Sequence, residues 1–218
     1  MSYSRTQPSP RYLELQAMYR RMHEKGEEHM QRRPEETFPG FSLDAQIERI
    51  EALIRRTGAD TVLDYGCGKG RQYEPREIRN SRGETWPGVI DYWDIGEVVC
   101  YDPCYPPYSR LPEGKFDGVI CTDVLEHCPE EDLPWILEEL FTYATRFVFA
   151  NVACYPANKR LPNGENAHCT IQPLQWWREL VEDISRRHPG VVWEIWVQSL
   201  ADPQAQPPVY QEEKITGG

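Results

Sequence analysis

Three glycines spaced two residues apart follow directly on a short apolar run. Residues 61–70 read Thr-Val-Leu-Asp-Tyr-Gly-Cys-Gly-Lys-Gly. Because glycine lacks a Cβ and readily adopts positive φ, such a turn lets a ligand approach bare backbone amides at the start of a following helix. Asp64, at the end of the run, can orient the turn or accept hydrogen bonds from a cationic ligand group. A phosphate loop is not indicated, because Gly70 precedes Arg71 rather than a lysine and a hydroxyl residue.

A second carboxylate, Asp102, ends the next long apolar run, at residues 96–102. In dinucleotide-binding folds an acidic residue at the end of the second strand binds the ribose hydroxyls. Two strands that each end in a carboxylate therefore predict a nucleoside pocket. A tight turn that binds no ligand stays the alternative interpretation of the glycines.

A long polar segment, residues 151–168, follows the apolar run at 146–151. Long, turn-rich connections of this kind are typical of binding loops, and we expect the second substrate there. Its candidate side chains can donate, accept or stack: Asn151, Tyr155, Asn166 and His168. Either His168 or His127 could take a proton from an acceptor, since imidazole titrates near neutral pH. A plain surface hairpin at Asn163-Gly164 is the alternative.

The remaining patterns predict elements that alternate between helix and strand. Helices are expected over 11–28, from Ser42 or Asp44 toward the strand that begins at Thr61, over 129–141 and over 172–187, with a short one at 123–127. Strands are expected at 61–65, 96–102, 115–122, 146–151 and 191–197. This order predicts an α/β fold with a largely parallel sheet, in which ligands bind beyond the carboxyl ends of the strands. Only the ends, 1–10 and 201–218, are expected to be loosely ordered.

Taken together, the motifs resemble those of class I S-adenosylmethionine-dependent methyltransferases of the small-molecule type. The similarity covers roughly Ala45 to Gln198 and rests on the glycine motif at 62–70, on Asp102 and on the Leu-Glu-His turn at 125–127. It implies a Rossmann-like fold with an N-terminal helical cap at 1–40, a cofactor domain at 41–200 and a tail at 201–218. S-adenosylmethionine is the implied cofactor, and its implied binding residues are Asp64, Gly66, Gly68, Gly70, Asp102, Thr122 and Asp123.

Two features depart from that family pattern. The stretch between Gly70 and Asp102 is longer than a single helix, and the Pro- and Tyr-rich link at 103–114 is too short for a helix and a strand. We therefore expect the third strand of the family fold to be missing, with aromatic residues of the link covering the adenine. No adenine-binding residue is predicted.

The spacing Asp123-x-x-Glu126-His127 also resembles the Glu-x-x-Glu-His arrangement of metal-dependent methyltransferases, with His168 as a further ligand. Such a set could hold Mg²⁺ or Zn²⁺ and lower the pKa of an acceptor hydroxyl. Many methyltransferases that need no metal share the Leu-Glu-His turn. We therefore favour Asp123 as a helix cap and His127 as a lone active-site residue, and predict no metal.

The resulting hypothesis is in-line O- or N-methylation of a small molecule. The residues expected to be catalytic are His127, Asn151, Tyr155 and His168. Tyr19 and His23, on a first helix that closes over the pocket, and Asn166 are expected at the substrate, although Tyr19 and His23 could serve packing alone. One alternative is an enzyme that cyclises or eliminates S-adenosylmethionine and releases methylthioadenosine. Another is a cofactor-binding module without catalysis.

The composition of the chain limits the kinds of partner that we expect for this protein. The 218 residues carry a formal net charge of −11, which disfavours a broad surface for nucleic acid. Seven cysteines without a Cys-x-x-Cys pair indicate reduced thiols, and no apolar stretch approaches the length of a membrane helix. We expect a cytoplasmic protein of one main domain that binds a small molecule and neither nucleic acid nor membrane. The oligomeric state is not predicted.

Overall fold

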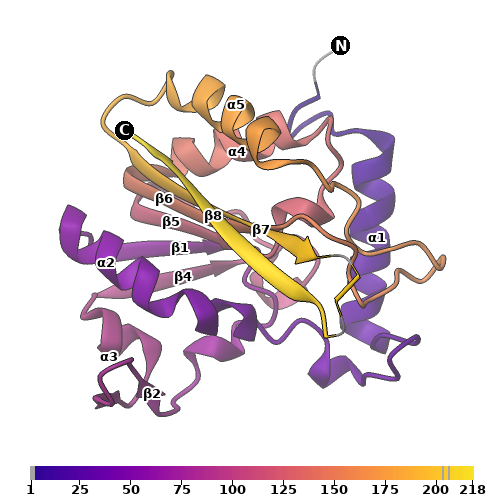
Figure 1. Cartoon of the computed structure of the whole chain (residues 1–218), viewed down its shortest axis with the longest axis horizontal. Coiled ribbons are helices and arrows are strands. Elements are labelled where there is room, and N and C mark those ends of the chain that lie inside the picture. The colour runs from indigo at the N-terminus through magenta and orange to yellow at the C-terminus, as the bar shows by residue number, and fades with distance from the viewer. Residues whose placement is uncertain (1–2, 203, 206) are drawn as a thin grey trace.

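The computed structural model describes residues 3–202, 204–205 and 207–218, and its centre is one mixed sheet of six strands (Figure 1). The strand order is β4-β1-β5-β6-β7-β8; the first five strands are mutually parallel and β8 pairs antiparallel to β7. Their bounds are β1 Thr61–Tyr65, β4 Glu97–Tyr101, β5 Phe116–Thr122, β6 Ala144–Ala153, β7 Val192–Asp202 and β8 Val209–Gly217. A separate two-stranded hairpin consists of β2 Ile78–Arg79 and β3 Thr85–Trp86. The prediction of a mostly parallel sheet flanked by helices is thus confirmed.

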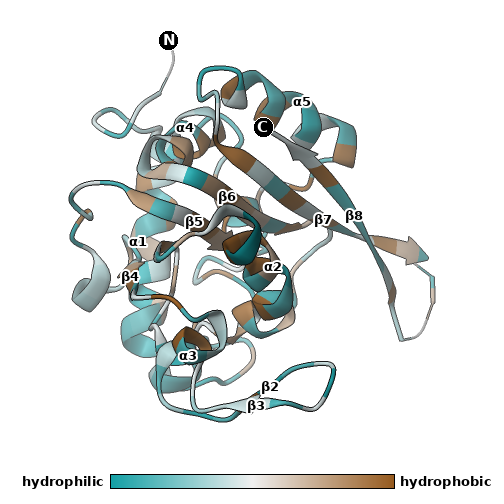
Figure 2. Ribbon diagram, turned by 90° about the vertical axis from the view of Figure 1, so that its left-hand side faces the viewer, coloured by the Kyte–Doolittle hydropathy of each residue, from teal (hydrophilic) through white to brown (hydrophobic). Residues whose placement is uncertain are grey.

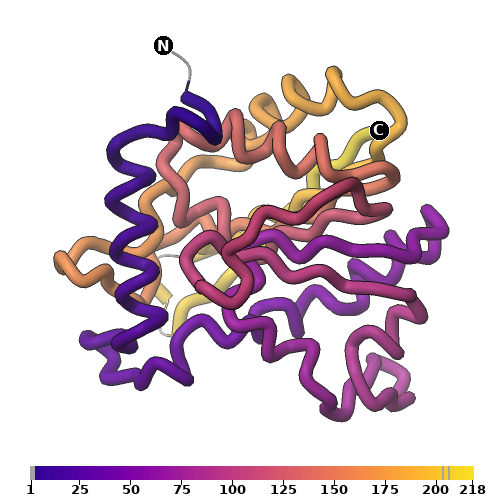
Figure 3. The backbone as a smooth tube through the Cα atoms, turned by 180° about the vertical axis from the view of Figure 1, so that it is seen from behind, coloured from indigo at the N-terminus to yellow at the C-terminus, as the bar shows by residue number. Residues whose placement is uncertain are grey.

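Helices cover both faces of the sheet. Helices α4 and α5 lie on one face and α2 and α3 on the other, whereas α1 crosses the carboxyl ends of the strands (Figures 1 and 3). The five helices are α1 Pro10–Lys25, α2 Ile47–Thr57, α3 Val89–Trp93, α4 Leu133–Tyr143 and α5 Leu174–Ser185. The sheet ends at β4, so within the described residues it has no strand in the position where the family pattern has its third.

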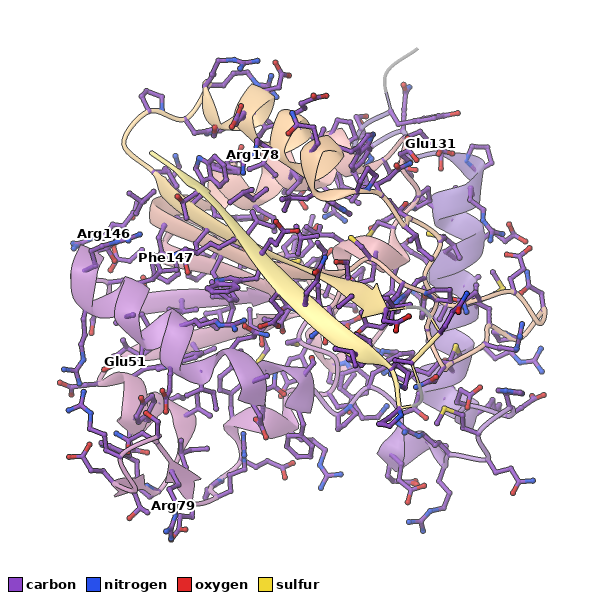
Figure 4. The ribbon with its side chains drawn as sticks, in the orientation of Figure 1. Glu51, Arg79, Glu131, Arg146, Phe147 and Arg178 are labelled. Atoms are coloured by element: carbon purple, nitrogen blue, oxygen red, sulfur yellow. The ribbon has the colours of Figure 1, made fainter. Side chains whose placement is uncertain are left out.

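The core consists of two apolar layers separated by the sheet, and Figure 2 shows the hydrophobic strands between more polar helices. Along β6, Val148 and Ala150 face α4 and α5, while Phe147 and Phe149 face α2. Phe147, labelled in Figure 4, packs over Gly118 so closely that a Cβ there would lie 2.2 Å from its ring. Strands buried on both faces explain why these segments appear in the sequence as continuous apolar runs.

The described residues of both chain ends are more ordered than we predicted, whereas residues 1–2, 203 and 206 lie outside the described residues. Ser9 caps α1 and its amide donates to Asp132, while the Arg5 guanidinium bonds to Glu139 and to the hydroxyl of Tyr65. At the other end, the expected loose tail forms β8. This strand escaped prediction because only Ile215 of its side chains is buried, so backbone pairing with β7 rather than a hydrophobic pattern holds it.

The short helix predicted at 123–127 is absent, and no α-helix directly follows the glycine turn. The glycine turn leads into a single 3₁₀ turn at Arg71–Tyr73, and residues 123–127 form only a 3₁₀ turn at Leu125–His127. Three glycines with positive φ and a chain that soon reaches Pro75 give the first segment little helix propensity. The site therefore lacks the amides of a long helix N-terminus at the glycine motif.

Candidate functional site

The glycine turn lies between the end of β4 and the segment before α2. Gly66 and Gly68 have φ angles of 90° and 61°, and the amide of Gly66 donates to the carbonyl of Tyr101 over 2.7 Å. A Cβ on Gly68 would lie 2.4 Å from the carbonyl oxygen of Phe38. Gly68 is therefore required by the close approach of the Phe38 backbone, and Gly66 by the Val124 side chain, which would lie 2.3 Å from a Cβ there.

Asp64 orients this turn and does not line a cavity. Its Oδ2 accepts hydrogen bonds from Gln72 Nε2 and from the hydroxyl of Tyr73, both over 2.9 Å. The side chain is buried, and burial raises the pKa of Asp64 to about 6. Of the two roles open to Asp64 in the sequence, the structure favours the orienting one. Gly70 likewise lies outside the cavities, beside the ring of Tyr108.

Asp102 lies at the end of β4 and binds the glycine turn directly. Its Oδ2 accepts from the Gly68 amide over 3.0 Å, and its Oδ1 accepts from the Cys104 amide over 2.8 Å. Burial raises the pKa of Asp102 to about 6, although these amides oppose the shift. Because each carboxylate oxygen has a second lone pair, Asp102 can still accept hydrogen bonds from a ligand in the adjoining cavity.

The first cavity is narrow, apolar and covered by α1, with a volume of about 120 Å³. Apolar and aromatic side chains dominate its wall, and Asp102 provides a carboxylate at one end. Tyr19 and His23, predicted at the substrate, line this cavity and not the second one described below. Leu15, Gln16, Cys104 and Val124 also line this cavity.

His23 is neutral at physiological pH. Burial and the Lys69 ammonium lower the pKa of His23 to about 3, and its Nδ1 lies 3.1 Å from Lys69 Nζ. The ring stacks on Tyr105, with centroids 5.1 Å apart, and approaches Asp102 to 3.9 Å. A residue of the Pro- and Tyr-rich link thus forms part of the surroundings of this cavity, near Asp102.

The second cavity is larger and more polar than the first, with a volume of about 470 Å³. It lies between the segment before α2, the end of β5 and the loop after β6. Tyr155, Lys159 and His168 of that loop line it, with Thr122 and Glu126 from the β5 side. Five residues line both cavities, namely Phe38, Gly66, Gly68, Asp123 and His127. The two cavities are therefore adjacent.

Asp123 stands at this boundary in an unfavourable backbone conformation. Its φ is 52°, which costs a non-glycine residue free energy and often marks a functional position. Its carboxylate does not cap a helix as predicted; it accepts a hydrogen bond from the Asn151 side chain. Asn151 lines neither cavity, so the structure makes it a residue that positions Asp123.

Glu126, His127 and His168 converge at the wall of the second cavity. Glu126 is fully buried; its Oε1 accepts from the Ala153 amide over 3.0 Å, and its Oε2 has no partner. The Nδ1 atoms of His127 and His168 lie 2.8 Å and 2.6 Å from the carbonyls of Ala167 and Tyr155. One nitrogen or oxygen from each of the three residues lies within 4.8 Å of the others.

The carbonyl contacts fix the tautomer of both histidines. The Tyr19 hydroxyl, which lies 2.9 Å from Nδ1 of His127, donates to the same Ala167 carbonyl over 2.8 Å. Because a carbonyl oxygen only accepts, each Nδ1 carries the proton and each Nε2 keeps its lone pair. Burial lowers the pKa of both rings, to about 3 for His127, so both are neutral. The site therefore offers two imidazole nitrogens and one carboxylate oxygen as acceptors.

Tyr155 and Asn166, both in the loop after β6, have different roles. The Tyr155 hydroxyl bonds to Gln198 of β7, and the residue lines the second cavity as predicted. Asn166 does not line the second cavity. Its side chain forms hydrogen bonds with the amide and the carbonyl of Ala157 and with the His168 amide, all over 2.9 Å. Asn166 therefore closes the loop and presents His168.

Sequence reasoning missed Phe38 and Lys159. Phe38 has a φ of 50° and its ring lies under the Lys159 ammonium, 4.7 Å from the ring centroid. Lys159 is the cation of the polar loop that lines the second cavity, and the basic pair Lys159-Arg160 within that turn-rich loop was the available signal. Nothing in the sequence near Phe38 indicates its position at the boundary of both cavities.

Comparison with models of known families, with curated proteins and with solved structures found no match to this chain. Within the described residues, no helix is both long enough and apolar enough to cross a membrane. The function is therefore argued from the site.

Proposed function

We propose that this protein transfers a methyl group from S-adenosylmethionine to a small molecule. The observation that carries the proposal is the pair of adjacent cavities at the carboxyl ends of the strands. One is apolar and ends at Asp102; the other is polar and contains unprotonated nitrogens. Ligands of open α/β sheets bind at the point where strand order reverses, which here lies between β1 and β5.

The residues of the first cavity fit a nucleoside. Leu15, Cys104 and Val124 offer apolar contacts to a flat base, and Asp102 retains lone pairs for ribose hydroxyls. Gly66 and Gly68 line both cavities, so a ligand that spans the two cavities would lie against backbone that carries no side chain. When bound, S-adenosylmethionine supplies a methyl group activated by the sulfonium. Asp64 would hold the turn in shape without touching the ligand.

The second cavity suits the methyl acceptor. Tyr155 and Lys159 can bind polar or anionic groups, and the Nε2 atoms of His127 and His168 can accept a hydrogen bond from a hydroxyl or amine. Asp123, fixed by Asn151, lies where the two ligands would meet. The chain's task is then to orient the two reactants in line and to exclude water.

A separate acceptor cavity favours methyl transfer over the two alternatives. Cyclisation or elimination acts on the cofactor alone and requires no second cavity of about 470 Å³. A module without catalysis would require no tautomers fixed toward that cavity. Analysis of the reaction products distinguishes the three functions.

The experiment is incubation of the full chain with S-adenosylmethionine that carries a CD₃ group. Reactions contain the cofactor alone or a panel of small hydroxyl and amine compounds, and products are analysed by mass spectrometry. The proposal predicts S-adenosylhomocysteine and a CD₃-labelled acceptor only when an acceptor is present. Methylthioadenosine above a protein-free control in the reaction without acceptor would replace the proposal by cyclisation or elimination. Binding without any turnover across the panel would favour the non-catalytic module.

A further inference from the structure

We propose that the methyl acceptor carries a carboxylate, and that the ammonium of Lys159 binds this carboxylate in the second cavity. The inference rests on the proposed function, and it narrows the acceptor to small hydroxy acids and amino acids. The observation that carries it is a half-buried lysine at the wall of a polar cavity, for which the described residues supply no counter-ion.

Lys159 differs from the other lysines of the chain in its surroundings. The exposed lysines are Lys25, Lys115 and Lys214. Lys69 is half-buried, and its Nζ donates to a backbone carbonyl over 2.9 Å. Lys159 is also half-buried, yet within the described part of the chain no carboxylate oxygen lies within 4.0 Å of its Nζ. Its positive charge is therefore available to a ligand.

The surroundings of the Lys159 ammonium compensate only partly for the loss of water. Burial and the Arg32 guanidinium lower the pKa of Lys159. The ring of Phe38, with its centroid 4.7 Å from Nζ, attracts the ammonium weakly. A cation removed from water without a charged partner costs free energy. An anion in the cavity would be that partner, and Arg32 lines the same cavity and adds a second positive charge.

The two acids of the cavity wall attract the ammonium without forming an ion pair with it. Asp123 accepts a hydrogen bond from the Asn151 side chain, and Glu126 accepts one from the Ala153 amide over 3.0 Å. Burial raises the pKa of both carboxyls, which disfavours their charged forms. Because any remaining negative charge on these acids would repel a doubly charged phosphate more strongly than a carboxylate, we infer a carboxylate ligand.

The loop that carries Lys159 is fixed by its own hydrogen bonds and by α1. The Ala167 amide donates to the Lys159 carbonyl over 3.2 Å. Leu161 of the same loop belongs to a buried cluster with Leu15 and Met22 of α1, and the loop lies beside this helix (Figures 1 and 3). A lysine on a fixed backbone loses less conformational entropy when it binds a ligand than a lysine on a mobile loop.

The positions of the cavities favour the acceptor over the cofactor as the source of the carboxylate. Lys159 lines only the second cavity, whereas Asp102, the proposed ribose ligand, lines only the first. The amino acid part of the cofactor would lie against Gly66 and Gly68, which line both. An acceptor with its carboxylate at Lys159 could place its hydroxyl or amine at the unprotonated Nε2 of His168, in the same cavity.

The test measures binding to the full chain by saturation-transfer NMR and calorimetry, both without cofactor and with S-adenosylhomocysteine. The probes are 3-hydroxybutyrate, 4-hydroxybenzoate and 4-aminobenzoate, each compared with its neutral primary amide, and benzoate compared with phenyl phosphate. Lys159→Met removes the charge and keeps an unbranched side chain, whereas Lys159→Arg keeps the charge. The matched control is Lys115→Met, on an exposed lysine that precedes β5, at the end of the strand opposite the cavities.

We expect at least one acid to bind the native chain at least about tenfold more tightly than its amide, because the amide cannot form the charge-assisted hydrogen bond. Lys159→Met should remove this preference, Lys159→Arg should retain part of it, and Lys115→Met should behave like the native chain. The affinity for S-adenosylmethionine should be equal in all four proteins. Thermal melting shows whether each variant is folded.

Several outcomes would overturn the inference. They are no binding of any acid to the native chain, equal affinities for acids and amides, tighter binding of phenyl phosphate than of benzoate, and the native preference in folded Lys159→Met. Weaker binding of S-adenosylmethionine by folded Lys159→Met would also overturn it, because the lysine would then bind the carboxylate of the cofactor.

The inference and the proposed function can fail separately. Acids that bind through Lys159 without release of S-adenosylhomocysteine in any reaction would retain the carboxylate site and contradict the proposed function. Methylation of a neutral acceptor by Lys159→Met at the native rate would retain the proposed function and contradict the carboxylate site.

Discussion

The imidazole of His168 lies edge to face against that of His127, although one belongs to the loop after β6 and the other to the turn after β5. In each ring, Nδ1 donates a hydrogen bond to a backbone carbonyl and Nε2 is left unprotonated. The loop positions His168 through Asn166, which bonds to both Ala157 and the His168 amide. The two histidines therefore bring the loop after β6 and the turn after β5 together at the wall of the second cavity.

Replacement of His168 by alanine should separate turnover from cofactor binding. His168 lines only the second cavity, so we expect His168→Ala to lower the rate of methyl transfer by about 10²–10⁴ while cofactor affinity stays unchanged. Rates are measured as product release with an acceptor from the panel that the native chain methylates, and affinities are measured by calorimetry. His188→Ala, on a histidine paired with Glu138, is the control and should retain native turnover. Native turnover in His168→Ala would show that His168 takes no part in methyl transfer.

A bulky side chain on α1 should block the first cavity. Gln16 lines the cavity and is half-buried, whereas Ala17 is exposed on the same helix. Gln16→Trp should abolish cofactor binding measured by calorimetry, because the indole would occupy a large part of about 120 Å³. Ala17→Trp introduces the same side chain on the exposed face of the same helix, and should bind normally. Equal affinities of the two variants would show that this cavity is not the cofactor site.

Removal of the Asp102 carboxylate should weaken the cofactor complex. Asp102→Ala loses a charge-assisted hydrogen bond, worth about 1.5–3 kcal/mol, or roughly a tenfold to 150-fold rise in Kd. Because the pKa of Asp102 is raised to about 6, native affinity should also fall as pH drops below about 6 and the carboxylate becomes protonated. Calorimetry of both proteins across this range should show the pH dependence only in the native chain. Unchanged affinity in Asp102→Ala would contradict the pocket assignment.

Asp64→Asn should stabilise the ligand-free protein near neutral pH. The folded pKa of Asp64 is raised from 3.8 to about 6, so its favourable contribution is present below about pH 4 and is lost as pH rises through 6. A shift of about two pKa units corresponds to about 3 kcal/mol at most. Asparagine keeps an acceptor for Gln72 and Tyr73 but does not ionise.

Urea unfolding of both proteins at several pH values between about 4 and 7 checks this prediction. The free energy of unfolding of Asp64→Asn relative to the native chain should increase with pH over that range. A constant difference would mean that Asp64 titrates at its ordinary pKa in the folded protein.

The parallel strands and the glycine turn were predictable because burial on both faces produces apolar runs. Val119, Ile120 and Cys121 of β5, for example, are all fully buried, and no polar residue interrupts them. The carboxylates at strand ends were predictable for the same reason, since a parallel sheet brings those ends to one edge. Asp102 and Asp123 therefore lie where their position in the sequence indicated.

Other features depend on contacts that a linear pattern does not contain. Edge strand β8 buries only Ile215, and its charged residues pair across strands, as Lys214 does with Glu194. The order of the N-terminal segment depends on Arg5 reaching Glu139. Likewise Asn151 and Asn166 were expected at the acceptor because of their polarity, but their partners are Asp123 and the loop backbone. Residue type alone could not distinguish a ligand contact from a structural one.

Calorimetric titration of the purified full chain with S-adenosylmethionine and with S-adenosylhomocysteine tests the central claim most directly. The account predicts that both bind with one equivalent per chain, and that Gln16→Trp removes this binding whereas Ala17→Trp retains it. If neither compound binds to the folded native chain, the two cavities at the ends of β1, β4 and β5 do not form a methyltransferase site.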